Sequence, residues 1–488
     1  MSLGNIPNDI YVPLVYIDID NSGAITGTPT LVNKVLVIGQ QLASGTATPL
    51  SARRIGSSEG DMDAAYGKGS MLTQMLKSFR ENNASTDLYA LGVADLTGSV
   101  ASATLTAAVT TANAGVIALL IDGVSVQVAV NDNDTVSTIA AAMMTAINAK
   151  DLPVTASVNS DVVTVTCNWK GTTGNDIDIR YNYYDGEVLP TGVSLTVTSM
   201  AGGAGTPDIS TIVAAIPDEW YNHIVMPYSD TQSLNGLRDE LVDRYGPLKM
   251  MEGIAYTAMR GTFSETSTWG DARNDYLITC MGTNKTPSSP WAFAAAYGAR
   301  ASYSLAIDPA RPLQTLVLTG ILPPSKTDRW DWTERNLLLQ SGVASYMVTA
   351  GDEVAIEREV STYKVNSYGD PDPSYLDITT PATLGYLRYS LKTMVTNRFP
   401  RHKLAGDDVL DFIAPGQPIV TPKIMRKAMI ELARIDWVPK GLMEDIEGFK
   451  STLSVYRDTS NQNRLNCVWK PDIVNQLRVF AALTQFKL

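Results

Sequence analysis

The spacing of hydrophobic residues changes twice between residues 34 and 93. A continuous apolar run is followed by a stretch with helical spacing and then by a second continuous run. The run KVLVIGQ at 34–40 is typical of a strand that is buried on both faces. The stretch 61–82 predicts one amphipathic helix, and LYALGV at 88–93 predicts a second buried strand. The apolar positions of the helix are Leu72, Met75, Leu76 and Phe79. Strand, helix and strand at this spacing indicate a parallel βαβ unit.

The pattern changes between residues 97 and 206, where threonine, valine, alanine and glycine dominate. Alternating apolar and polar positions predict several strands, and Asp122-Gly123 predicts a hairpin turn between two of them. One helix is expected over 135–149, and the sequence MAGGAG at 200–205 is typical of a flexible joint. We expect a β-rich domain that is inserted into an α/β fold and projects from its surface.

The strand and helix rhythm returns after residue 207. The helix expected over 231–245 is predicted to begin with a capping box of Ser229 and Gln232 and to end before Gly246. A third block is expected from Asp352 onwards. It contains a long helix that ends before Pro400, and a second helix opened by Thr421 and Pro422.

Both ends of the chain have the alternation of strands. The segment 477–488 carries apolar residues on both faces if it is extended, which is typical of a strand with neighbours on two sides. At the other end, Pro13 restricts the segment 11–20 to an edge or a strand start. The candidate contact residues of these two arms are Val12, Val15, Ile17, Ile19, Leu477, Val479, Phe480, Leu483 and Phe486. The alternative is that each end pairs within its own subunit.

These patterns predict a mixed α/β, multidomain protein with an interrupted α/β core, an inserted β-rich domain, and an α+β C-terminal domain with strand-like terminal arms. The expected boundaries are 1–25 for the N-terminal arm, 26–96 and 207–350 for the core, 97–206 for the insert, 351–474 for the C-terminal domain and 475–488 for the C-terminal arm.

The bulk composition restricts the partners. The chain has 488 residues and a formal net charge of −12, which disfavours binding to nucleic acid or to an anionic membrane. No apolar run approaches the roughly 20 residues that cross a bilayer, and the start MSLGNIPNDI does not have the pattern of a secretory signal. The three cysteines are far apart and predict reduced thiols, so we expect the protein to fold in a cytoplasm.

Recognisable catalytic, metal-binding and cofactor-binding motifs are missing from the sequence. The two histidines, His223 and His402, offer little for acid–base chemistry, and there is no HExxH or CxxC pair for zinc. The loop GQQLASGT at 39–46 follows a strand, but it lacks the lysine that a phosphate-binding loop needs. We therefore expect no catalytic, metal or cofactor site and favour a structural or binding protein. An enzyme with a carboxylate pair remains the alternative, because spacing does not exclude it.

Two stretches resemble the tail sheath proteins of Mu-like contractile-tailed phages. The first is AIDPARPLQTLVLTGILPPSKTDRWDWTERNLLLQSGVASYMV at 306–348, followed by EVAIEREVSTY. The second is the opening IPNDIYVPLVYIDIDNSGA at 6–24, together with KVLVIGQQLASGT. A surface adhesin is a further alternative, because the insert is rich in threonine and valine, but the missing signal peptide weakens it.

The resemblance implies a structural subunit of a contractile sheath that forms stacked hexameric rings around a tail tube and shortens when the baseplate triggers it, without nucleotide hydrolysis. Its implied partners are other copies of itself, the tube protein, and baseplate and tail terminator proteins, in the virion tail and, during assembly, in the host cytoplasm. The arms would link neighbouring subunits, and the insert would face outwards. A cationic helix over 422–437 is expected to face the tube, with an ordinary solvated helix face as the alternative. Its candidate contacts are Lys423, Arg426, Lys427 and Arg434.

Overall fold

The computed structural model describes residues 31–412, 414 and 416–487. The chain divides into two compact units, Val32–Gly385 and 386–487, and the division falls inside helix α9 (Thr379–Arg398). The sequence-based boundary at 351 lies earlier than this division. Strand β15 (Val354–Arg358) pairs with β14 (Ser345–Val348) and belongs to the larger unit.

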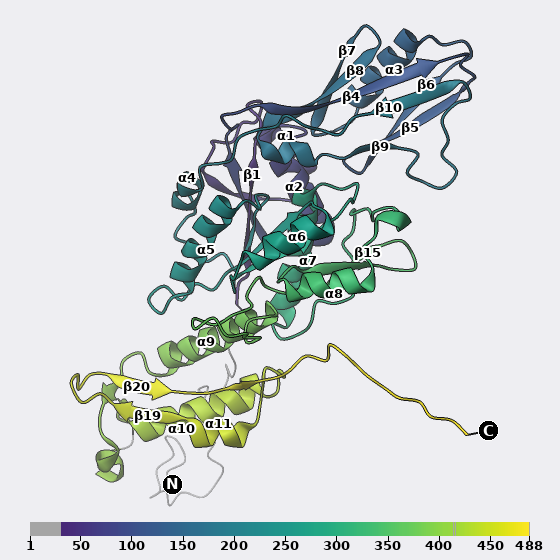
Figure 1. Ribbon diagram of the computed structural model, residues 1–488. Coiled ribbons are helices and arrows are strands. Elements are labelled where there is room, and N and C mark those ends of the chain that lie inside the picture. The colour runs from purple at the N-terminus through teal and green to yellow at the C-terminus, as the bar shows by residue number, and fades with distance from the viewer. Residues whose placement is uncertain (1–30, 413, 415, 488) are drawn as a thin grey trace, which may run out of the picture. The chain divides into compact units, whose positions relative to one another are not determined.

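A six-stranded sheet forms the centre of the larger unit (Figure 1). Five of its strands run parallel, and β2 lies antiparallel to β3 at one edge. In spatial order the strands are β13 (Ile278–Gly282), β12 (Ile254–Met259), β11 (His223–Val225), β1 (Lys34–Gln40), β3 (Asp87–Val93) and β2 (Ala52–Ile55). The predicted parallel pairing of 34–40 with 88–93 is confirmed.

Helices cover both faces of this sheet, which is why β1 reads as a continuous apolar run. Val35 and Val37 belong to the core beneath one helix layer, whereas Leu36 and Ile38 belong to the core beneath the other. The first layer contains α1 (Glu59–Tyr66), α2 (Met71–Asn82) and α7 (Pro290–Ile307), and the second contains α4 (Ile209–Ala214) and α5 (Thr231–Tyr245). Helices α6 (Phe263–Asp271) and α8 (Trp332–Gln340) pack against each other.

Two local predictions in this unit are wrong. The helix expected over 61–82 is two helices, because Gly67 and Gly69 adopt φ values of +87° and +72° and break it. The cap of α5 is Asp230, whose carboxylate accepts a hydrogen bond from the Ser233 amide. Ser229 instead offers its carbonyl to the Trp269 indole nitrogen, at 2.8 Å.

The β-rich insert, residues 97–206, follows β3 in the chain and ends before α4. It contains two sheets, of order β10-β4-β8-β7 and β6-β5-β9, and a helix, α3 (Val136–Asn148), which contacts β7 and β6. Its strands are β4 (Val100–Val109), β5 (Gly115–Ile121), β6 (Val124–Val130), β7 (Val154–Asn159), β8 (Val162–Lys170), β9 (Ile179–Tyr181) and β10 (Val193–Val197). The predicted hairpin is confirmed, with Asp122 and Gly123 at φ +49° and +77° between β5 and β6.

The glycine-rich segment at 200–205 is not the flexible joint that its composition suggests. Ser99 and Ala204 exchange two backbone hydrogen bonds, so the two segments that connect the insert run side by side. The Asn175 side chain also bonds both the amide and the carbonyl of Gly203, each at 2.9 Å. The glycines are needed for close approach: a Cβ on Gly98 would lie 1.9 Å from the Ala204 carbonyl oxygen.

The smaller unit is built from short elements that follow α9. Helix α10 (Pro422–Leu432) continues into a π-helical turn at Ala433–Trp437, and α11 (Ile446–Thr452) comes next. Three two-stranded sheets accompany these helices. They are β16 (Lys403–Leu404) with β17 (Ile419–Val420), β18 (Met443–Glu444) with β21 (Asp472–Ile473), and β19 (Ser454–Arg457) with β20 (Leu465–Val468).

Candidate assembly site

The hairpin of β19 and β20 is an isolated two-stranded sheet in the described part of the chain. Its register runs from Ser454 opposite Val468 to Arg457 opposite Leu465, and neither strand has a third neighbour among the described residues. One side of the hairpin packs on α10, where the Cys467 thiol lies 3.4 Å from the Met429 sulfur. The outer edge of each strand therefore presents main-chain groups that no other described strand pairs with, and these are the groups that an added strand binds.

The turn of this hairpin is held rigidly by Asp458. Its carboxylate accepts hydrogen bonds from the Ser460 hydroxyl at 2.7 Å, from the Asn466 side chain at 2.8 Å, and from the Ser460 and Asn461 amides. These bonds, led by that from the Ser460 hydroxyl, hold the pKa of Asp458 far below its usual range. The register of β19 with β20 is thus fixed by its own turn.

The C-terminal segment leaves the fold directly after β21. The Val474 amide bonds to the Leu442 carbonyl at 3.2 Å, and no helix or strand follows up to residue 487 (Figure 1). The predicted contact residues there are 74 to 85% exposed: Leu477, Val479, Phe480, Leu483 and Phe486. Among the described residues no strand pairs with this segment, so the expected terminal strand is not seen there. The other predicted arm, with Val12, Val15, Ile17 and Ile19, lies outside the described residues.

The cationic helix begins at Pro422, as expected. The Thr421 hydroxyl accepts the Ile424 amide at 3.3 Å, and Met425, Met429 and Leu432 are buried. Lys423, Lys427 and Arg434 are exposed.

Two features of this helix could not be seen in the sequence. The Arg426 guanidinium is engaged within the subunit, because it donates to the Leu453 carbonyl at 3.2 Å and to the Lys450 carbonyl. The helix does not stay α-helical to Trp437, because the π-helical turn changes its spacing. That change in spacing leaves Ile435 56% exposed.

The core of the smaller unit centres on Trp437, which the sequence analysis did not single out. Its ring lies 5.8 Å from that of Phe449 and 5.3 Å from that of Trp469. Beside it the buried Asp436 carboxylate accepts the Tyr386 hydroxyl at 3.1 Å and pairs with the Lys440 ammonium at 2.6 Å. No local motif predicts this cluster, because its members come from four separate segments.

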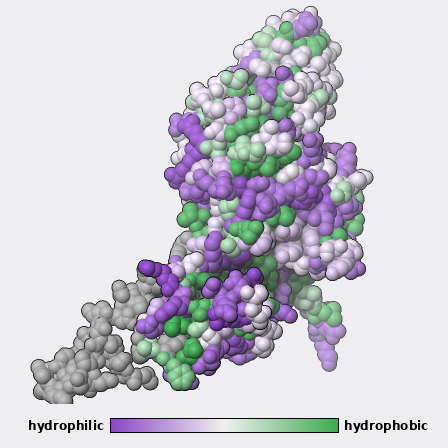
Figure 2. Space-filling view, turned by 90° about the vertical axis from the view of Figure 1, so that its left-hand side faces the viewer, coloured by the Kyte–Doolittle hydropathy of each residue, from purple (hydrophilic) through white to green (hydrophobic). Residues whose placement is uncertain are grey.

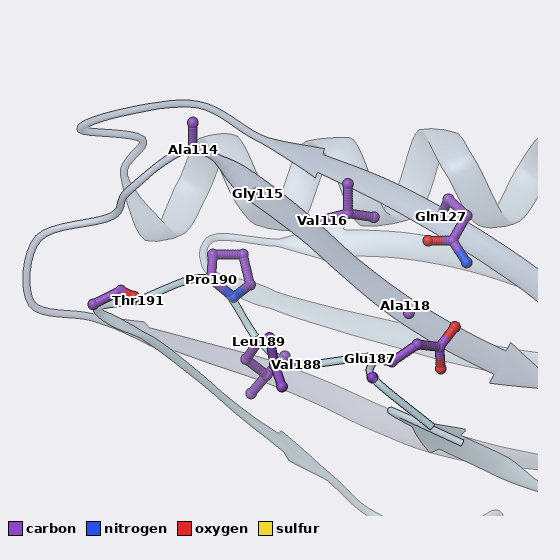
Figure 3. A pocket seen from close by; sticks show the side chains of 11 residues that line it. Ala114, Gly115, Val116, Ala118, Gln127, Glu187, Val188, Leu189, Pro190 and Thr191 are labelled. Atoms are coloured by element: carbon purple, nitrogen blue, oxygen red, sulfur yellow. The ribbon is translucent and has the colours of Figure 1, made fainter. Parts of the chain in front are cut away.

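Two features could suggest enzymatic chemistry, a buried histidine and a cavity, and neither is arranged as a catalytic site. His223 is buried in the central sheet with its Nδ1 atom 3.1 Å from the Tyr256 hydroxyl, and burial lowers the pKa of its imidazole to about 3. A cavity of the β-rich insert lies between β5 and the loop 186–191, and its polar side chains are Gln127, Glu187 and Thr191 (Figure 3). Glu187 is the one charged residue in that lining, so the cavity offers no pair of carboxylates.

The described residues contain neither a metal-binding cluster nor a membrane-spanning helix. No group of three or more His, Cys, Asp or Glu side chains there is arranged to hold a metal ion. No described helix combines the length and apolar character of a membrane span. On the face shown in Figure 2, apolar and hydrophilic residues are interspersed over the larger unit, which is ordinary for a folded protein surface and does not mark a partner.

The sequence matches three family models, which together span most of the chain. Residues 96–196 match the phage tail sheath protein beta-sandwich domain, 202–362 match the phage tail sheath protein central domain, and 370–487 match the phage tail sheath C-terminal domain. The chain is 44% identical over 491 residues to the Mu-like prophage FluMu tail sheath protein of Haemophilus influenzae, covering 100% of both chains.

The solved structures that resemble this chain have much lower sequence identity to it than this relative does. A sheath tail protein from Listeria innocua has 12% identity and a TM-score of 0.48, covering 92% of this chain and 93% of that one. A sheath tail protein from Desulfitobacterium hafniense has 10% identity and a TM-score of 0.49, covering 94% and 100%. The sequence matches decide the assignment: the chain belongs to the phage tail sheath protein family and is a structural subunit of a contractile phage tail.

Proposed function

We propose that the subunit polymerises as stacked hexameric rings around a tail tube, and that the polymer shortens to drive the tube through a host envelope. Two observations carry this proposal together: the C-terminal segment is exposed and apolar, and the β19–β20 hairpin has two edges that are open among the described residues. The described part of the chain supplies no strand partner for either feature, and other copies of the same chain would supply one for each.

The link between subunits is strand addition. The segment 477–488 of one copy pairs with an edge of the β19–β20 hairpin of a neighbour, and the N-terminal segment 11–20 of another copy joins the same sheet. A ladder of main-chain hydrogen bonds gives this link its strength with little dependence on side chains. Each large apolar side chain that is removed from water adds about 1.5–3 kcal/mol, and Phe480 and Phe486 are the largest of them in the segment.

This kind of link suits a lattice that rearranges. Subunits must stay connected while their bodies rotate, and the chain after Val474 leads directly from the last paired strand into the segment, so it acts as the hinge. The β18–β21 pair stays with the body, because Ile473 is paired with Met443. Energy for shortening comes from the metastable lattice, so no nucleotide is required.

The remaining surfaces are assigned by charge and by topology. The exposed Lys423, Lys427 and Arg434 face the tube, because cations concentrated on one element of a protein with net charge −12 suit an acidic partner. The β-rich insert faces outwards, since it is connected by two adjacent segments on one side. Baseplate and tail terminator proteins bind the two ends of the polymer.

The proposal is tested by removing the segment while keeping the fold. A chain that ends after Val474 keeps the pair of Ile473 with Met443 and the bond from the Val474 amide. We expect a folded subunit with unchanged thermal unfolding that forms no hollow cylinders in electron micrographs.

A point variant separates the ladder from the apolar contact. Val479→Pro removes one main-chain donor and should lower the yield of cylinders, whereas Val479→Thr keeps the donor and the branched shape and should assemble. Normal cylinders from the shortened chain would show that the segment is not the connection.

A further inference from the structure

Buried side chains of the β-rich insert and of the first helix layer form one continuous hydrophobic core. The Trp169 ring, near the end of β8, meets the Trp291 ring, near the start of α7, edge to face with 5.5 Å between the ring centroids. Both rings are fully buried, and such an aromatic pair contributes beyond the apolar area that it removes from water. The apolar contact between insert and core therefore lies in the interior of the larger unit.

Helix α2 of the core binds the insert through polar residues on one face. The Gln74 side-chain nitrogen donates to the Asp122 carboxylate in the β5–β6 turn at 3.1 Å, and its side-chain oxygen accepts the Trp291 indole N–H at 2.9 Å. One turn further on, the Lys77 ammonium pairs with the Asp151 carboxylate of the insert at 2.6 Å. Residues three apart share a helix face, so this face of α2 is turned towards the insert.

The start of α2 is shaped by the insert as well. Gly69 has a φ of +72°, and a Cβ at this position would clash with the Leu152 carbonyl oxygen of the insert. The Asn168 side-chain nitrogen donates to the Leu152 carbonyl at 3.1 Å and to the Gly69 carbonyl at 3.3 Å. The break between α1 and α2 thus lies where the backbone of the insert approaches the core.

Further polar contacts surround the shared core. The Arg180 guanidinium of the insert donates to the Lys285 carbonyl at 3.0 Å, and the Tyr183 hydroxyl donates to the Pro323 carbonyl at 2.8 Å. Both acceptors are main-chain groups of the core, so these bonds fix the position of its backbone. The insert is therefore attached over a broad surface in addition to its two connecting segments.

We propose that the insert is a folding partner of the core, so that α2 and α7 keep their positions only while the insert is folded and docked on them. Insert and core then unfold together and move as one rigid body. The proposal concerns the single subunit and does not depend on how the polymer forms. An insert that merely decorated the surface would instead open and close on its own, with no effect on the protection of the core.

Native-state hydrogen exchange of the full-length subunit tests this coupling. The change is Met143→Ala on α3, because Met143 is fully buried and α3 packs on β6 and β7 of the insert. The cavity that it leaves should lower the protection of a peptide covering 162–169 of the insert by at least about tenfold. We expect the same fold-loss of protection in a peptide covering 291–301 of α7, in the core.

Two further variants on α3 complete the experiment. Ile147→Val removes one methylene from another fully buried side chain, and its smaller loss of protection should again be equal in the two peptides. This milder change keeps the test valid if Met143→Ala does not fold. The matched control is Thr145→Ala, because Thr145 is exposed and its hydroxyl bonds the Ala141 carbonyl of its own helix. It should leave both peptides as in the wild type.

The ratio of the two losses decides the result. Equal losses in the insert and α7 peptides support the proposal. A loss confined to the insert peptide, in either buried variant, would overturn it, because the core would then keep its structure while the insert opens. Retention of the far-ultraviolet circular dichroism of each variant confirms that the comparison concerns a folded subunit.

Discussion

The Trp437 indole nitrogen donates a hydrogen bond to the Ser390 hydroxyl over 2.7 Å, and both side chains are fully buried. Ser390 lies on α9 and Trp437 closes the π-helical turn after α10, so this bond joins two helices of the smaller unit. Removing the acceptor leaves a buried N–H without a partner, which costs more than the bond itself contributes.

We predict that Ser390→Ala lowers the free energy of unfolding of the smaller unit by about 1–3 kcal/mol, measured by chemical denaturation with tryptophan fluorescence. Thr396→Ala on the same helix is the matched control, because Thr396 is exposed and its hydroxyl bonds only the Lys392 and Thr393 carbonyls of its own helix. Equal effects of the two substitutions would argue against a role of the Trp437 bond.

The cationic residues of α10 give a prediction about the tube. Lys423→Glu combined with Lys427→Glu should reduce co-sedimentation with tail tubes, because it replaces attraction by repulsion, and the remaining binding should be lost at lower salt. Arg426 is kept, since its guanidinium supports the Lys450 and Leu453 carbonyls and its loss would disturb the fold.

The control for this prediction carries the same change of net charge elsewhere. Lys392→Glu with Lys470→Glu alters two exposed lysines outside α10 and should leave tube binding unchanged. Equal binding by both double variants would remove α10 from the tube contact.

His223 gives a prediction about acid stability. Its pKa falls from an ordinary value near 6.5 to about 3 in the fold, because burial disfavours the charged imidazole. The unfolded chain therefore binds one more proton between these values, so the stability is complete above pH 6.5 and declines as pH falls. The expected loss is about 1.4 kcal/mol for each pH unit below 6.5.

The variant His223→Gln should remove this contribution, so that its free energy of unfolding falls less steeply than that of the wild type between pH 6.5 and pH 4. Glutamine can still bond the Tyr256 hydroxyl. His402→Gln, in which the replaced ring contacts Phe399 at 5.2 Å in the smaller unit, is the matched control for the chemical change. A parallel slope for His223→Gln would contradict the assignment.

The sequence by itself determined those features that depend on the conformational preferences and the hydrophobic pattern of neighbouring residues. The run at 34–40 is apolar throughout because alternate residues enter two different cores, and this predicts a central strand. Asp122 and Gly123 accept positive φ, which is what a two-residue hairpin turn demands, so the turn could be predicted from two letters. The hydroxyl of Thr421 and the ring of Pro422 likewise mark the start of α10.

Only the tertiary structure decided the features that depend on contacts between segments distant in the sequence. Gly298 lies inside α7, where a Cβ would lie 2.6 Å from the Val225 side chain. A glycine is needed there because of a strand that is over 70 residues away in the sequence. Arg426 looks like any surface cation until α11 places the Lys450 and Leu453 carbonyls beside it. The glycine-rich joint is rigid because Asn175 lies opposite it. The segment 477–487 has the pattern of a strand but remains exposed, since a strand needs a ladder partner and the described chain supplies none.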